Sequence, residues 1–128
     1  MLQKTSFKLK QKRKEFKMKT KYIPQENADK ILKLLTMAQE QNQTIGFWLR
    51  SDDGETSVKS RNPEKILSEM DGVDDNFGIN FMGKTVPESD ARECLGWVYL
   101  TPYEEEDCVI CNYSDNEFCE KLIASVEA

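Results

Sequence analysis

The last third of the chain decides the fold, and its residues 94–126 read CLGWVYLTPYEEEDCVICNYSDNEFCEKLIASV. Residues 94–100 are apolar at successive positions, which predicts a strand buried on both faces and placed centrally in a sheet. Thr101-Pro102 ends this strand, and residues 108–113 predict a fifth strand that returns beside it as a hairpin. A capping box is predicted at Ser114 and Glu117. It starts a C-terminal helix whose buried stripe is Cys119, Leu122, Ile123 and Val126.

The first half of the chain predicts a helix followed by a hairpin. Behind Pro24, helical spacing over about residues 25–41 brings apolar residues onto one stripe, namely Ala28, Ile31, Leu32, Leu35 and Ala38. The alternating residues 44–50 then predict a strand, and the turn at 51–54 leads to a more polar strand near 56–60. We expect the apolar stripe of this helix to pack against one face of the sheet.

The middle of the chain adds one short helix and one strand. Asn62-Pro63 supplies an N-cap and a preset first helical residue, and Asp71-Gly72 ends this helix. Alternation of Phe77, Ile79 and Phe81 predicts the third strand. The resulting order α-β-β-α-β-β-β-α predicts a single α+β domain, with an about five-stranded, largely antiparallel sheet that carries three helices on one face.

Charge divides the chain into two parts. The 128 residues carry a net charge of −5, but residues 1–23 hold nine Lys or Arg against Glu15 alone, whereas residues 24–128 hold 22 acids against nine bases. We therefore predict a basic N-terminal extension over 1–23 and an acidic domain over 24–128. The extension is either a disordered arm that binds nucleic acid or anionic lipid, or a translated leader ahead of a true start at Met18. The leader hypothesis rests on Lys14-Glu15, which can be encoded by a purine-rich string typical of a bacterial ribosome-binding site.

Composition also predicts the compartment and argues against catalysis. No apolar run approaches the length of a transmembrane helix, and no apolar segment follows the basic N-terminus, so we expect a cytoplasmic protein without membrane contact. Histidine is absent, which removes the commonest general base and the commonest metal ligand. We predict a protein that is not an enzyme, with no catalytic residue, metal or cofactor.

The four cysteines allow a second hypothesis, a metal or redox protein built on Cys94, Cys108, Cys111 and Cys119. The spacing argues against it. Cys108 and Cys111 are three residues apart on a predicted strand, so their side chains would leave opposite faces of the sheet. We therefore predict that the cysteines pack in the core as small apolar residues.

The acidic residues gather in predicted loops, which indicates a surface for a basic protein partner. Like charges held close together repel unless a cationic surface compensates them, and such a cluster steers a basic partner. We expect Trp48 and Tyr103 to act as aromatic anchors of this surface, because Trp and Tyr are enriched among interface hot spots. The predicted partner-binding residues are Asp52, Asp53, Asp74, Asp75, Glu104, Glu105, Glu106, Asp107, Trp48 and Tyr103.

These patterns predict an inhibitor or adaptor of bacterial or phage type that docks on a basic protein. Anti-restriction, anti-CRISPR and nuclease-immunity proteins are analogous in size and charge, since some present carboxylates in place of DNA phosphates. The folded domain repels phosphate, so we expect it not to bind nucleic acid directly. The alternative hypothesis is a domain whose acidity serves solubility alone.

Overall fold

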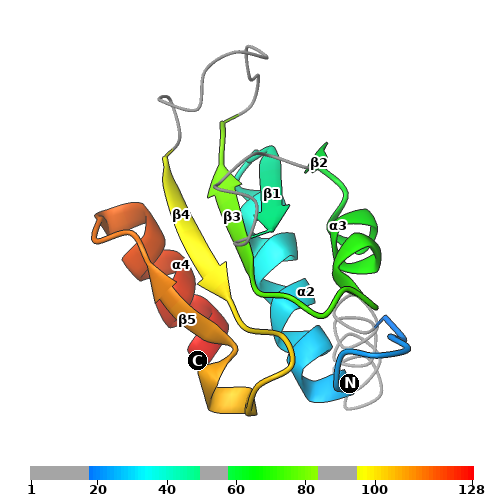
Figure 1. Cartoon of the computed structure of the whole chain (residues 1–128). Helices are drawn as coiled ribbons and strands as arrows, with labels where there is room; N and C mark the ends of the chain where they lie inside the picture. The colour runs from blue at the N-terminus through cyan, green and yellow to red at the C-terminus, as the bar shows by residue number, and fades with distance from the viewer. Residues whose placement is uncertain (1–17, 50–57, 84–94) are drawn as a thin grey trace, which may run out of the picture.

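The helices and strands of the chain form an α+β fold, as the sequence predicts. The computed structural model describes residues 18–49, 58–83 and 95–128. Within these ranges, three α-helices and five strands follow in the predicted order, with one short 3-10 helix added (Figure 1): α2 Gln25–Glu40, β1 Ile45–Leu49, β2 Val58–Ser60, α3 Pro63–Met70, β3 Phe77–Phe81, β4 Gly96–Leu100, η3 Glu106–Cys108, β5 Ile110–Tyr113 and α4 Glu117–Glu127. No helix within the described ranges is long and apolar enough to cross a membrane.

The sheet has the order β2-β1-β3-β4-β5, and every neighbouring pair is antiparallel. Both predicted hairpins, β1-β2 and β4-β5, are confirmed. β4 has neighbours on both sides, although β3 is the middle strand. The prediction that β4 is buried on both faces is wrong: Val98 and Leu100 are buried, whereas Trp97 and Tyr99 are only half-buried, because helices cover one face alone.

The core lies between the sheet and the helices, which Figure 1 shows packed on one side of it. The predicted stripes of α2 and α4 are both confirmed, since all of their members are buried. Gly96 faces the core at the point where α4 crosses β4, and a methyl group there would overlap the sulfur of Cys119. A glycine in β4 therefore lets the C-terminal helix approach the sheet closely.

The opposite face of the sheet carries an aromatic cluster. Trp97 and Tyr99 stack with ring centroids 4.4 Å apart, and Tyr99 meets Trp48 edge-on at 5.5 Å. The Trp48 ring lies on the backbone of Gly78, where any side chain would collide with it. Trp48 therefore lies on the sheet face that the helices leave open.

Two local predictions need correction. The N-cap of α4 is Asn116, whose side chain accepts from the Cys119 amide, and not Ser114. The Ser114 hydroxyl instead accepts a hydrogen bond from the Trp97 amide of β4 at 2.7 Å. This tertiary contact replaces the capping bond that the sequence predicted for Ser114. The fifth strand begins at Ile110 and not at Cys108, because residues 106–108 form η3.

Residues 18–23 belong to the folded part, although their charge had placed them in the basic extension. Ile23 is buried in the core, and Met18 packs against it. The backbone amides of residues 21–23 donate hydrogen bonds to the carboxylate of Asp71, at the end of α3. The predicted extension over residues 1–17 lies outside the described residues.

Candidate functional site

Two acidic segments far apart in the sequence meet at one end of the molecule. The first follows α3 and contains Asp74 and Asp75, and the second is the acidic run 104–107 between β4 and β5. Tyr103 joins them, because its hydroxyl accepts from the Gly72 amide at 3.1 Å and donates to the Met70 carbonyl at 3.4 Å. We call residues 71–75 together with 103–107 the acidic end.

The acidic run lies on an ordered loop. Thr101 closes it, since its amide donates to the Val109 carbonyl and its hydroxyl to the Cys108 carbonyl. Asn27 of α2 is almost fully buried beneath it and donates its amide group to the carbonyls of Pro102 and Glu104, each at 2.8 Å. The side chains of the run therefore project from a fixed backbone, and all four are exposed: Glu104, Glu105, Glu106 and Asp107.

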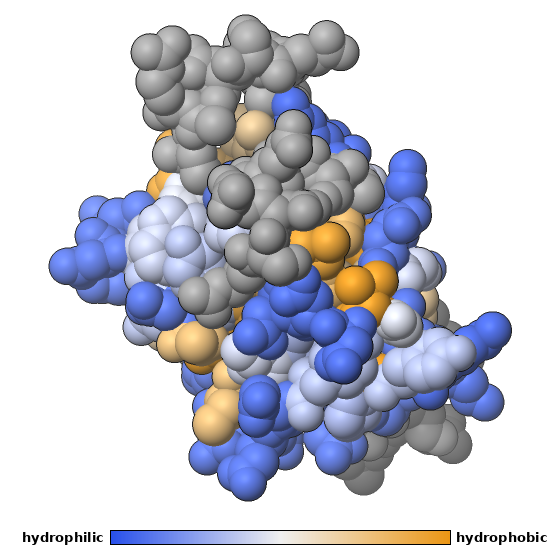
Figure 2. Space-filling view, viewed as in Figure 1, coloured by the Kyte–Doolittle hydropathy of each residue, from blue (hydrophilic) through white to orange (hydrophobic). Residues whose placement is uncertain are grey.

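One lysine of α2 lies beside this end of the molecule. Lys30 of α2 lies 3.0 Å from the Glu127 carboxylate and donates to the backbone carbonyl of Glu106 at 3.4 Å. Its ammonium group is directed to the C-terminal helix, and among the described residues none of the four carboxylates of the run forms an ion pair. Figure 2 shows mainly hydrophilic side chains at the lower end of the molecule, where Figure 1 places the connection between β4 and β5.

Two exposed apolar side chains lie beside the acidic residues. Tyr22 is 68% exposed with its ring against Gly72, and Val73 is 38% exposed between Asp71 and Asp74. An exposed aromatic side chain close to charged residues is a typical anchor in protein interfaces. Sequence reasoning missed both residues. The signals were an apolar residue within an otherwise polar turn and a tyrosine within a basic segment.

The charges of this end act on two neighbouring groups. The pKa of Tyr103 is raised, first by burial and then by the charges of Asp71 and Asp74, although the Gly72 hydrogen bond opposes the rise. The pKa of the Cys108 thiol is raised, first by the charge of Asp107, then by burial and a hydrogen bond to Asp107, and then by Glu105 and Glu104. Both groups therefore keep their protons at neutral pH.

Asp71 behaves differently from the other carboxylates of the end. Burial raises the pKa of its carboxyl group, but the backbone amides of Lys21, Ile23 and Tyr22 and the charge of Lys21 outweigh burial and lower it. Asp71 is thus an ionised carboxylate, and both of its oxygens accept hydrogen bonds from backbone amides. It attaches residues 18–23 to α3 and is not directed to a partner.

The structure separates the two predicted aromatic anchors. Tyr103 is half-buried and joins the two acidic segments. Trp48 lies in the aromatic cluster of the open sheet face, and its buried indole Nε1 has no hydrogen-bond partner within the part of the chain that the structure describes. Asp52 and Asp53 lie outside the described residues. The acidic end therefore contains seven of the ten predicted residues, which are Tyr103 and six acids: Asp74, Asp75, Glu104, Glu105, Glu106 and Asp107.

The cysteines divide in a way that the sequence did not predict. Cys119 is buried as expected, but Cys108 and Cys111 are exposed, so their placement in the core was wrong. Cys108 ends η3 before the strand begins. Cys111 is the extra residue of a bulge in the edge strand β5, since Tyr99 pairs with Asn112 and Leu100 with Ile110. Within the described ranges, no three Cys, Asp or Glu side chains are arranged to hold a metal ion, and Cys94 lies outside them.

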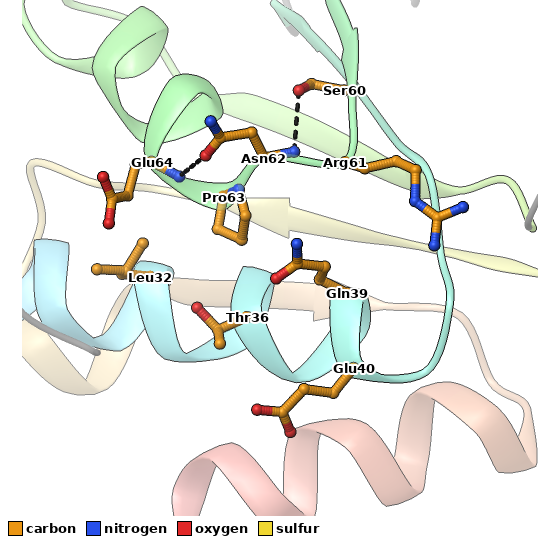
Figure 3. Close-up of a pocket in the computed structure, with 9 residues that line it drawn as sticks. All are labelled: Leu32, Thr36, Gln39, Glu40, Ser60, Arg61, Asn62, Pro63 and Glu64. Atoms are coloured by element: carbon orange, nitrogen blue, oxygen red, sulfur yellow. Dashed lines mark hydrogen bonds between the residues drawn. The ribbon is translucent and has the colours of Figure 1, made fainter. Parts of the chain in front are cut away.

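A groove of about 860 Å³ lies between α2 and the start of α3. Figure 3 shows Thr36 and Gln39 of α2 facing Pro63 across it. Asn62 is engaged in capping α3, because its side chain accepts from the Glu64 and Lys65 amides. None of the lining side chains carries a buried polar atom that lacks a partner. The groove is open to solvent, and none of its lining residues belongs to the acidic end.

Comparisons with protein-family models, with curated proteins and with solved structures find no match for this chain. The arrangement of its own residues is therefore the basis of the functional argument.

Proposed function

We propose that this chain is a small, non-enzymatic, cytoplasmic binding protein that docks through its acidic end on a basic surface of a protein partner, as an inhibitor or adaptor. The observation that carries the proposal is the bond between Tyr103 and Gly72, which holds two acidic segments side by side. Tyr22 and Val73 are exposed beside the first of these segments, with the Tyr22 ring against Gly72.

Charge repulsion and a fixed loop conformation favour binding over a purely solubilising role. Four consecutive carboxylates repel one another, and that repulsion is relieved when a cationic surface replaces the surrounding water and ions. Solubility requires charge but no particular backbone geometry. Here Asn27 and Thr101 hold the acidic run in one conformation. Preorganisation of this kind reduces the entropy lost on association.

The chemistry of the surface defines the class of partner. Carboxylates attract Lys and Arg and repel phosphate, so the folded domain acts on a protein and not directly on nucleic acid. A protein that itself binds nucleic acid, such as a nuclease, carries a basic surface of this kind. The finer proposal is that the acidic end occupies such a surface in place of nucleic acid, by analogy with anti-defence and immunity proteins.

Carbodiimide crosslinking tests this function directly. The reagent joins a carboxylate to a lysine amine only when the two are in contact, so crosslinks in a complex isolated from the producing cells map the docking surface. We expect crosslinks at Glu104, Glu105, Glu106, Asp107 and Asp74. Crosslinks confined to carboxylates of the other surfaces, such as Glu64, Glu69 and Glu120, would contradict the proposal.

A further inference from the structure

One carboxylate holds the segment that leads into α2. The Asp71 Oδ2 atom accepts from the Lys21 amide at 2.7 Å, and Oδ1 accepts from the Tyr22 and Ile23 amides at 2.9 Å each. These bonds join residues 48 to 50 positions apart. Hydrogen bonds to an ionised acceptor are the strong ones in proteins.

Few other contacts attach this segment to the domain. Ile23 is 3% exposed, Met18 is half-buried, and Tyr22 is 68% exposed. Gln25 donates to the Met18 carbonyl at 2.7 Å, whereas the bond from Thr20 to the Ile23 carbonyl lies within the segment itself. The apolar contribution is thus one buried isoleucine and part of a methionine, far less than any strand or helix of the core provides.

We propose that residues 18–23 form a strap that opens as a unit, with Asp71 as its latch, while the sheet and the three helices stay folded. Local opening of this kind is expected where buried apolar contacts are few and one polar group makes most of the attachments. Opening withdraws Ile23 and Met18 from the core between α2 and α3. It also releases Tyr22 from Gly72.

Opening of the strap would change the surface that the acidic end offers to a partner. This effect on binding rests on the proposed docking function. Asp71 and Gly72 are adjacent, so the turn that holds the strap is the turn that Tyr103 holds. When the strap opens, the Asp71 carboxylate loses its three amide donors and becomes available to a partner, three residues before Asp74. A basic partner therefore favours the open form, because that form offers it one more carboxylate.

Amide hydrogen exchange of the whole chain, followed by NMR, tests the strap. In the native protein we expect the amides of Lys21, Tyr22 and Ile23 to exchange through one shared opening. Its urea dependence is shallow, because little surface is exposed, whereas the amides of β3 exchange through global unfolding with a steep dependence. Exchange of the three strap amides only with β3, at the same urea dependence, would overturn the proposal.

Two substitutions identify the latch. Asp71→Ala removes every acceptor, so the protection of all three amides falls by about tenfold or more, and their exchange keeps its shallow urea dependence. The protection of β3 falls by no more than the same factor, because global unfolding also breaks these bonds, and its urea dependence stays steep. Asp71→Asn keeps one acceptor oxygen and places an amide group near the other donor, so the Lys21 amide loses more protection than those of Tyr22 and Ile23. Asp74→Ala is the matched control and leaves the strap unchanged. Equal protection in Asp71→Ala and native protein would overturn the proposal.

The native measurement decides the question even if Asp71→Ala does not fold. No partner enters the experiment. Failure of the strap would leave the docking proposal standing, and failure of docking would leave the strap standing.

Discussion

The phenol oxygen of Tyr103 lies 3.1 Å from the backbone nitrogen of Gly72, and this one contact joins the two acidic segments. Gly72 ends α3 with φ of 95°, in the left-handed region that favours glycine. The Tyr22 ring covers it from the other side. The turn 71–73 is thus held by the strap and by the acidic loop together.

Substitution of Tyr103 by Phe keeps the ring and removes the hydroxyl. The Gly72 amide loses its acceptor, so we expect the free energy of unfolding to fall by about 1 kcal/mol, measured by urea denaturation. The control is Tyr113→Phe, whose ring is 36% exposed at the edge of the sheet. Equal small effects in both variants would mean that the Tyr103 hydroxyl does not hold the turn.

Substitution of Asn27 by Ala tests whether the acidic run is preorganised. The change removes both amide donations and leaves the carbonyls of Pro102 and Glu104 without these donors. We expect a loss of about 2 kcal/mol in unfolding free energy and faster amide exchange over residues 102–108. The control Gln39→Ala, an exposed position of the same helix, changes neither quantity. An unaltered loop in Asn27→Ala would contradict the argument from preorganisation.

Substitution of Gly78 by Ala tests the aromatic cluster of the open sheet face. The added methyl group overlaps the Trp48 ring, which must leave its position beside Tyr99. We expect a destabilisation of about 1–3 kcal/mol and a shift of tryptophan fluorescence to longer wavelength. The control Glu69→Ala, at an exposed position of α3 outside the aromatic cluster, leaves the fluorescence maximum in place. A native spectrum in Gly78→Ala would show that Trp48 does not rest on this glycine.

The thiol of Cys108 reports the electrostatic potential of the acidic end. Its pKa is raised, first by Asp107, so less thiolate is present near pH 8 and alkylation is slow. Removal of that charge in Asp107→Asn lowers the pKa, and we expect the rate of modification by iodoacetamide to rise by at least about twofold. The rate is read for the Cys108 peptide by mass spectrometry. Glu120→Gln is the control, and a rate that responds equally to both changes would contradict a local field.

Much of the fold could be predicted because the spacing of apolar residues along the sequence matches the period of the helix or strand that buries them. The stripe of α2 predicted a helix over about 25–41, and the helix observed is Gln25–Glu40. Alternation predicted β3 at its observed bounds. Antiparallel pairing followed from short connections between strands. These features depend on neighbours in the sequence.

The corrected features depend on contacts that no local pattern contains. Ser114 does not cap α4 because its hydroxyl binds the Trp97 amide, 17 residues away. Cys111 is exposed because a bulge in an edge strand displaces it. The acidic segments could each be found by composition, but their proximity rests on Tyr103 and Gly72, 31 residues apart. Asp71 was predicted as a helix end, and its role as the strap's acceptor required the tertiary structure.

The most direct test of the account compares two variants with the same net charge. In the first, Glu104, Glu105, Glu106 and Asp107 become Gln, Gln, Gln and Asn. In the second, the same number of amides replaces exposed acids elsewhere, at Glu64, Glu69, Glu120 and Asp115. Each is titrated calorimetrically against the basic protein recovered from the crosslinked complex. We predict that the first variant binds at least about tenfold more weakly and that the second binds like the native chain. Equal affinities for the two variants would contradict docking through the acidic end.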